Sequence, residues 1–110
     1  MLKTSALSAT LLAMIAFAVP VKADDSGFAS SHTLRKERGY TCMADHFHTG
    51  SGEGKSKEAA QAAAIKSWAE FTAFEYGTDW ARYGRAVSKA VHYTKSADGW
   101  SASIEARPCR

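Results

Sequence analysis

The chain has 110 residues, of which 14 are basic and 11 are acidic, so its formal net charge is +3. A chain of this length is expected to form one small domain and has no room for a second core. The modest charge argues against a strongly basic nucleic-acid-binding domain.

The first 23 residues have the pattern of a secretory signal peptide. Lys3 gives the amino terminus a positive charge, and Ala6–Val19 is apolar. Val21-Lys22-Ala23 then has small residues at the positions that a signal peptidase recognises. The apolar run is shorter than the roughly 20 residues that span a bilayer, although a retained amino-terminal anchor is the alternative. Cleavage after Ala23 predicts a periplasmic or secreted protein that starts at Asp24 and has no membrane span.

Cleavage would also change the charge of the protein. Loss of Lys3 and Lys22 lowers the 14 basic residues to 12, against 11 acidic ones, which leaves a net charge of +1. Nucleic acid is therefore not an expected partner. Residues 24–38 are polar and small and are predicted to be a flexible leader, followed by a single domain over 39–110.

Two cysteines, Cys42 and Cys109, lie in the predicted mature chain. An even number of cysteines in an exported chain predicts a disulfide, with a metal-binding or catalytic thiol as the alternative. The bond would close a loop of about 68 residues, for which chain entropy predicts a stabilisation of about 4 kcal/mol.

The first predicted elements are a strand over 40–48 and a helix over 57–76. Glycines bound the strand, and a glycine-rich loop over 49–56 follows it. Ser56 suits the helix N-cap, and Gly77 suits the position just after its end.

Two further strands are predicted over 85–95 and 100–107. Asp98-Gly99 between them favours a hairpin turn. Residues 78–84 read as a turn with one short helical turn. The last strand alternates cleanly between apolar and polar residues, whereas the pattern of the strand over 85–95 leaves its buried face undecided.

The predicted fold is α+β, with the order β-α-β-β. A Cys42–Cys109 bond makes the first and third strands antiparallel neighbours, so the three-stranded antiparallel or mixed sheet has the order 1-3-2, with one helix on one face. In this arrangement Met43 and Phe47 are expected in the core, and Tyr40 on the open face. That face could bind an envelope partner or a second copy, or the leader could cover it.

The stretch TGSGEGKS, residues 49–56, differs by one residue from a phosphate-binding loop. An exported chain of this size lacks the parallel sheet of a nucleotide hydrolase, so we do not expect nucleotide chemistry. A helix N-terminus still attracts anions. The candidate anion-binding residues are Gly52, Gly54, Lys55, Ser56 and Lys57.

The sequence GSGEGKSKEAAQAAA at Gly50–Ala64 resembles the point in double-stranded-RNA-binding domains where a glycine-rich turn enters the helix. The resemblance implies that Lys55 and Lys57 would contact phosphates. It does not extend to the first helix of that family, and we interpret it as local convergence.

The pair His46-x-His48 would place two imidazoles about 6.5–7 Å apart on the open face of the strand. This spacing can bind Zn or Cu, with two solvent-facing histidines as the alternative. Beyond such an ion, no cofactor is predicted. Glu75 falls near the apolar helix face and is expected to pair with Arg82 or Arg85, or to reach solvent, with a buried catalytic carboxylate as the alternative.

The segments SWAEFTAFEYG and EARPC resemble small exported proteins of Proteobacteria without an assigned function. The resemblance implies export and a cysteine pair, and it implies no active site. The sequence therefore predicts a non-enzymatic accessory or binding protein of the cell envelope. The alternative is a module that binds an anion or a metal ion.

Overall fold

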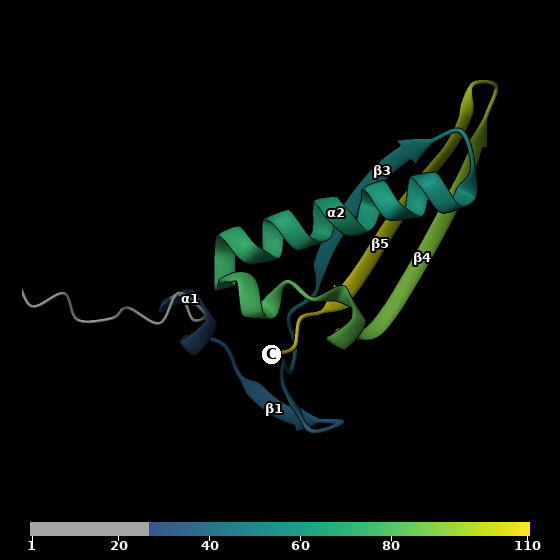
Figure 1. Ribbon diagram of the computed structural model, residues 1–110. Helices are drawn as coiled ribbons and strands as arrows, with labels where there is room; N and C mark the ends of the chain where they lie inside the picture. Colours follow the sequence, from purple (N-terminus) through teal and green to yellow (C-terminus); the bar gives the residue numbers. More distant parts are fainter. Residues whose placement is uncertain (1–26) are drawn as a thin grey trace, which may run out of the picture.

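The computed structural model describes residues 27–110, and the predicted signal peptide and the start of the leader lie outside them. The described chain forms two sheets and one long helix, with shorter helical pieces (Figure 1). In chain order the elements are α1 (Gly27–Ser30), β1 (Leu34–Glu37), β2 (Tyr40–Met43), β3 (His48–Gly54), α2 (Lys57–Tyr76), η1 (Thr78–Trp80), η2 (Tyr83–Arg85), β4 (Val87–Ser96) and β5 (Gly99–Arg107).

The larger sheet has the strand order β3-β5-β4, and both of its pairings are antiparallel. Helix α2 lies across one face of this sheet (Figure 1). The predicted α+β class, the order 1-3-2 and the single covering helix are confirmed. Within residues 27–110, no helix has the length and apolarity needed to cross a membrane.

The first strand of this sheet lies later in the chain than predicted. The expected strand over 40–48 is split into β2 and the start of β3, and the glycine-rich stretch forms β3 itself. Its partner in the register is β5, with Gly52 opposite Ala102 and Gly54 opposite Trp100. The prediction of a loop over 49–56 is therefore wrong, because only Lys55 and Ser56 connect β3 to α2.

Close packing of α2 explains why β3 is rich in glycine. Gly50, Gly52 and Gly54 share the face toward the helix, and a Cβ on any of them would collide with it. At Gly52 this atom would lie 2.5 Å from the Cβ of Ala63. At Gly54 it would lie 2.6 Å from the backbone nitrogen of Ala60. Glycines on the strand and alanines on the helix thus bring the two backbones together.

Helix α2 has the predicted bounds. Ser56 Oγ accepts from Ala59 N at 3.1 Å as the N-cap, and Gly77 follows the helix with φ of 105°. Phe71 lies beside the buried face of the helix and is 47% exposed. The reason is that the buried stripe recurs every four residues; its members are Ala60, Ala64, Trp68, Thr72 and Tyr76.

The amino-terminal part of the described chain packs at the C-terminal end of α2 (Figure 1). Residues 27–38, predicted to belong to a flexible leader, contain α1 and β1, and β1 pairs with β2 in a small antiparallel sheet. The reason is a second cluster of buried residues within the same domain, which the sequence pattern did not reveal. Its buried members are Ala29, Met43, Tyr76 and Trp80.

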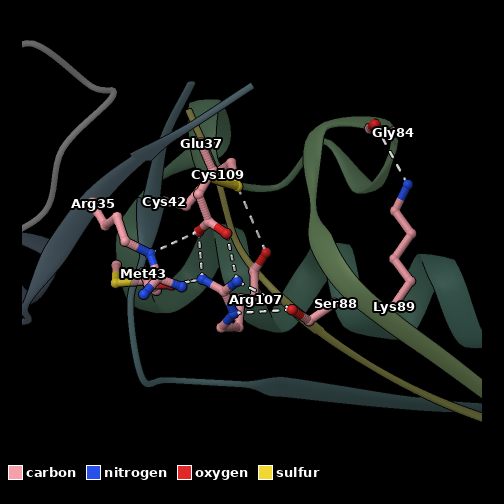
Figure 2. Close-up of a disulfide and its surroundings, with 9 residues drawn as sticks. All are labelled: Arg35, Glu37, Cys42, Met43, Gly84, Ser88, Lys89, Arg107 and Cys109. Carbon is pink, nitrogen blue, oxygen red and sulfur yellow. Dashed lines mark hydrogen bonds and ion pairs between the residues drawn. A yellow bond between two sulfur atoms is a disulfide. The ribbon is translucent and has the colours of Figure 1, made fainter. Parts of the chain in front are cut away.

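The disulfide joins Cys42 of β2 to Cys109 just after β5, as predicted (Figure 2). Thr41 and Arg110 exchange two backbone hydrogen bonds of 2.9 and 2.8 Å beside it. The end of the chain therefore extends the pairing of β5 onto β2 and links the two sheets. A disulfide is compatible with an oxidising compartment such as the periplasm or the cell exterior.

A buried arginine makes a second link between the sheets (Figure 2). Arg107 pairs through both terminal nitrogens with Glu37 of β1 at 2.6 and 2.7 Å, and it donates to Met43 O at 2.7 Å. Ser88 Oγ accepts from it as well. The guanidinium holds the pKa of Glu37 at about 2, although burial opposes this shift.

Strand β4 contains a bulge, which explains its ambiguous sequence pattern. The register shifts between Val87 and Ala90, and Ser88 has a positive φ of 54°. Val87 is buried with the disulfide, whereas Val91 pairs with Ile104. The extra residue moves the two valines to different faces.

The face of the larger sheet away from α2 is polar. It presents hydroxyl and charged side chains of β3 and β5 with the alternation expected of a solvated sheet face. Phe47, expected in the core, is 44% exposed because it precedes β3. Tyr40 was expected on this face but belongs to the small sheet. The exposed residues on β3 and β5 are Thr49, Ser51, Glu53, Ser103 and Glu105.

Candidate metal centre

Three histidines gather at the C-terminal end of α2. His32 lies between α1 and β1, His46 lies in the connection from β2 to β3, and His48 is the first residue of β3. Glu75 and Tyr76 come from the last turn of α2. We call these five residues the histidine cluster.

Three members of the cluster have the arrangement of metal ligands. One donor atom each from His32, His46 and Glu75 lies within 4.8 Å of the others, and all three side chains are half-buried. Two imidazoles and a carboxylate suit Zn and Cu. A cavity of about 270 Å³ adjoins His32 and His46, with Asp45 in its lining, so small solutes reach these two histidines from solvent.

His48 lies behind this group and is fully buried against the helix. Its Nδ1 is 2.8 Å from Thr72 Oγ1, and that hydroxyl donates its proton to Trp68 O at 2.7 Å. Since the hydroxyl has one proton, His48 Nδ1 carries a hydrogen and donates to Thr72. The Nε2 atom of neutral His48 then carries a lone pair.

A carboxylate oxygen lies beside that nitrogen. His48 Nε2 lies 3.2 Å from Glu75 Oε2, but the contact does not have the geometry of a hydrogen bond. Burial lowers the pKa of His48 to about 4, against the opposing effect of Glu75. At neutral pH the ring is therefore neutral, and a buried acceptor nitrogen lies beside an acceptor oxygen.

His32 repeats this pattern. Its Nδ1 is 2.7 Å from Phe28 O, and because a carbonyl only accepts, Nδ1 donates the hydrogen. The other nitrogen, Nε2, lies 3.1 Å from the hydroxyl of Tyr76. Burial and Glu75 raise the pKa of Tyr76, so its phenol stays protonated and can donate to His32.

The structure brings the predicted pair His46 and His48 together, with ring centroids 5.1 Å apart. The predicted placement of the two residues on the open face of one strand is wrong. Only His48 belongs to a strand, and its side chain faces α2. His48 has the same parity as Gly50, which fixes this orientation. Glu75 contacts His48, a partner that the sequence did not predict.

His32 was missed by the sequence reasoning. It lies in a short polar segment without periodicity, and only the tertiary packing of α1 brings it to the cluster. For Glu75 a signal existed, because a carboxylate on an otherwise apolar helix face needs a partner. Its relation to His48 could not be derived without the correct start of β3.

The predicted anion site lies at the other end of α2 from the histidines. Ser56 caps the helix, while Gly52 and Gly54 are strand residues packed against it. The ammonium group of Lys57 lies 4.8 Å from the ring centroid of Trp100. Anion binding at Lys55, Ser56 and Lys57 stays a prediction, and the glycines have a packing role that explains them without a ligand. The remaining histidine, His92, lies on the polar sheet face.

Comparison with protein-family models, curated proteins and solved structures gives no significant match.

Proposed function

We propose that the protein is a non-enzymatic accessory protein of the cell envelope that binds a transition-metal ion at the histidine cluster. The observation that carries this proposal is the convergence of His32, His46 and Glu75 within 4.8 Å. The signal-peptide pattern ending at Ala23 and the disulfide support export to the periplasm or exterior.

The hydrogen bonds around the histidine cluster favour a metal-binding role over a purely structural role for these residues. Histidines that bind metals commonly donate their other ring N–H to a carbonyl or another acceptor, which fixes the tautomer. His32 does so toward Phe28 O, and His48 does so toward Thr72. Nε2 of His48 consequently has no hydrogen-bond partner and lies beside the Glu75 carboxylate, while Nε2 of His32 contacts the hydroxyl of Tyr76.

The ligand types favour Zn and Cu among the common ions. Imidazole suits these metals, whereas Mg and Ca prefer sites built from oxygen ligands. An anion at the N-terminus of α2 has less support, because Lys57 lies over aromatic rings and the nearby glycines are used in packing. The polar sheet face remains a predicted surface for an envelope partner or a second copy.

Zinc or copper is expected to raise the melting temperature of the metal-free protein. An ion at one hundred times its dissociation constant stabilises the folded state by about 2.7 kcal/mol. For a domain of this size that corresponds to a shift on the order of 10 °C. Thermal unfolding followed by circular dichroism, with each ion and with a chelator, measures the shift.

The double variant His32→Ala/His46→Ala is expected to lose this shift. The variant His92→Ala is the matched control, because it removes a histidine from the distant polar face, and it is expected to keep the full shift. The proposal is contradicted if neither ion stabilises the wild-type protein, or if the double variant responds as the wild type does.

A further inference from the structure

We infer that His48 is the fourth ligand of the bound ion, so that the site is a closed tetrahedral set of three histidines and Glu75. This inference rests on the proposed metal-binding function. The inference adds a fourth ligand, His48, to the three half-buried ones. His48 is fully buried and lies on the side of the cluster away from solvent.

The distance between His48 and Glu75 fits one shared ion. Zinc binds histidine nitrogen and carboxylate oxygen at about 2.0–2.2 Å, so two ligand atoms of one tetrahedron lie roughly 3.3–3.5 Å apart. His48 Nε2 and Glu75 Oε2 are 3.2 Å apart. An ion placed beside this pair can therefore bind both atoms with almost no movement of either side chain.

The contact between His48 Nε2 and the Glu75 carboxylate lacks the geometry of a hydrogen bond. In the singly protonated ring the hydrogen lies on Nδ1 and is donated to Thr72, so Nε2 offers a lone pair that a metal ion can accept. Within the described residues, this nitrogen is the buried side-chain atom that finds no hydrogen-bond partner. Burying an acceptor without a partner is unfavourable, and a metal bond would offset this cost.

The surrounding packing holds the His48 ring in place for such a bond. The ring is stacked on Tyr76, with centroids 4.7 Å apart and planes 13° from parallel. Thr72 fixes the tautomer and the rotation about the side-chain bond. Thr72 is thus a positioning residue, and His48 sets the number of protein ligands and the preference for ions that accept tetrahedral geometry.

Cobalt(II) tests the inference because its visible spectrum reports its coordination. A tetrahedral ion absorbs strongly in the visible range, whereas an octahedral ion absorbs weakly. The full mature protein with Co²⁺ is expected to give the intense spectrum. His48→Gln is expected to give the weak one with at least tenfold lower affinity, while the control His92→Gln matches the wild type.

The variant Thr72→Val keeps His48 as a ligand but removes the hydroxyl that accepts the Nδ1 hydrogen of His48. We expect it to retain the tetrahedral spectrum and to bind Co²⁺ about 10–100-fold more weakly. A weak spectrum in the wild type, or an unchanged spectrum and affinity in His48→Gln, overturns the role of His48 and leaves the proposed function standing. Absence of any Co²⁺ or Zn²⁺ binding by the wild type contradicts both.

A measurement on the wild type avoids variants that fail to fold. In a long-range ¹H–¹⁵N spectrum, addition of Zn²⁺ is expected to move the Nε2 signal of His48 to the range of metal-bound nitrogen, while Nδ1 stays protonated. Zinc binding that shifts the ring nitrogens of His32 and His46 but leaves those of His48 unchanged would contradict the inference.

Discussion

Replacing Gly52 with alanine is expected to lower the free energy of unfolding by about 3 kcal/mol or more, which is among the largest effects of adding one methyl group. The new Cβ would lie 2.5 Å from the Cβ of Ala63 and 2.6 Å from its carbonyl carbon. Since backbone atoms of α2 are involved, relief requires the helix to move away from β3. Denaturant unfolding measures the loss.

Ser51→Ala is the matched control for this variant. Ser51 is the neighbouring residue of β3, it is exposed, and it points to the other face of the sheet. Its substitution is expected to change the stability by less than about 0.5 kcal/mol. If Gly52→Ala were as stable as Ser51→Ala, the close approach of strand and helix would be wrong.

Changing Glu37 to glutamine is expected to destabilise the protein by about 2–3 kcal/mol at pH 7. The substitution removes the negative partner of Arg107, whose side chain is only 7% exposed, and leaves a buried guanidinium without its counter-charge. Because the side chain of Glu37 is 25% exposed, we place the effect below that of a fully buried pair.

The effect of Glu37→Gln is expected to depend on pH. The pKa of Glu37 is lowered from 4.5 to about 2 in the folded protein, so its stabilisation is complete above pH 4.5 and is lost as the pH falls toward 2. Unfolding free energies measured from pH 7 to pH 2 should show the two proteins converging. Glu53→Gln on the polar face serves as the control, and a difference between wild type and Glu37→Gln that stays constant over this range would contradict the ion pair.

Local signals in the sequence were sufficient for much of the fold. Ser56 and Gly77 determined the bounds of α2, because capping depends on neighbouring residues. The pair Cys42 and Cys109 determined which strands are neighbours, because a disulfide restricts the distance between its two residues.

The glycine-rich stretch misled the sequence reasoning for a physical reason. Glycine is depleted in strands and enriched in loops, so residues 49–56 were predicted to be a loop. In the structure the alternate glycines of β3 admit the helix backbone. The alanines at the start of α2 indicated that a neighbouring segment could approach the helix closely. The sequence did not show that this segment is the glycine-rich one, because close packing depends on both segments together.

The candidate site was partly visible in the sequence. His46, His48 and Glu75 were each identified as unusual, but the error in the start of β3 placed the two histidines on the wrong face of the sheet. His32 contributes through a tertiary contact of a segment that has no repeating pattern. Such contacts depend on the packing of α1, which short-range propensities do not encode.

The most direct test of the account is the position of a bound ion. In crystals of the protein grown with one equivalent of Zn²⁺, X-ray data collected on both sides of the zinc absorption edge locate the metal. A zinc site at the histidine cluster predicts an anomalous peak about 2.0–2.2 Å from donor atoms of His32, His46 and Glu75, and from Nε2 of His48. Zinc bound elsewhere in the protein, with no peak at the histidine cluster, would contradict it.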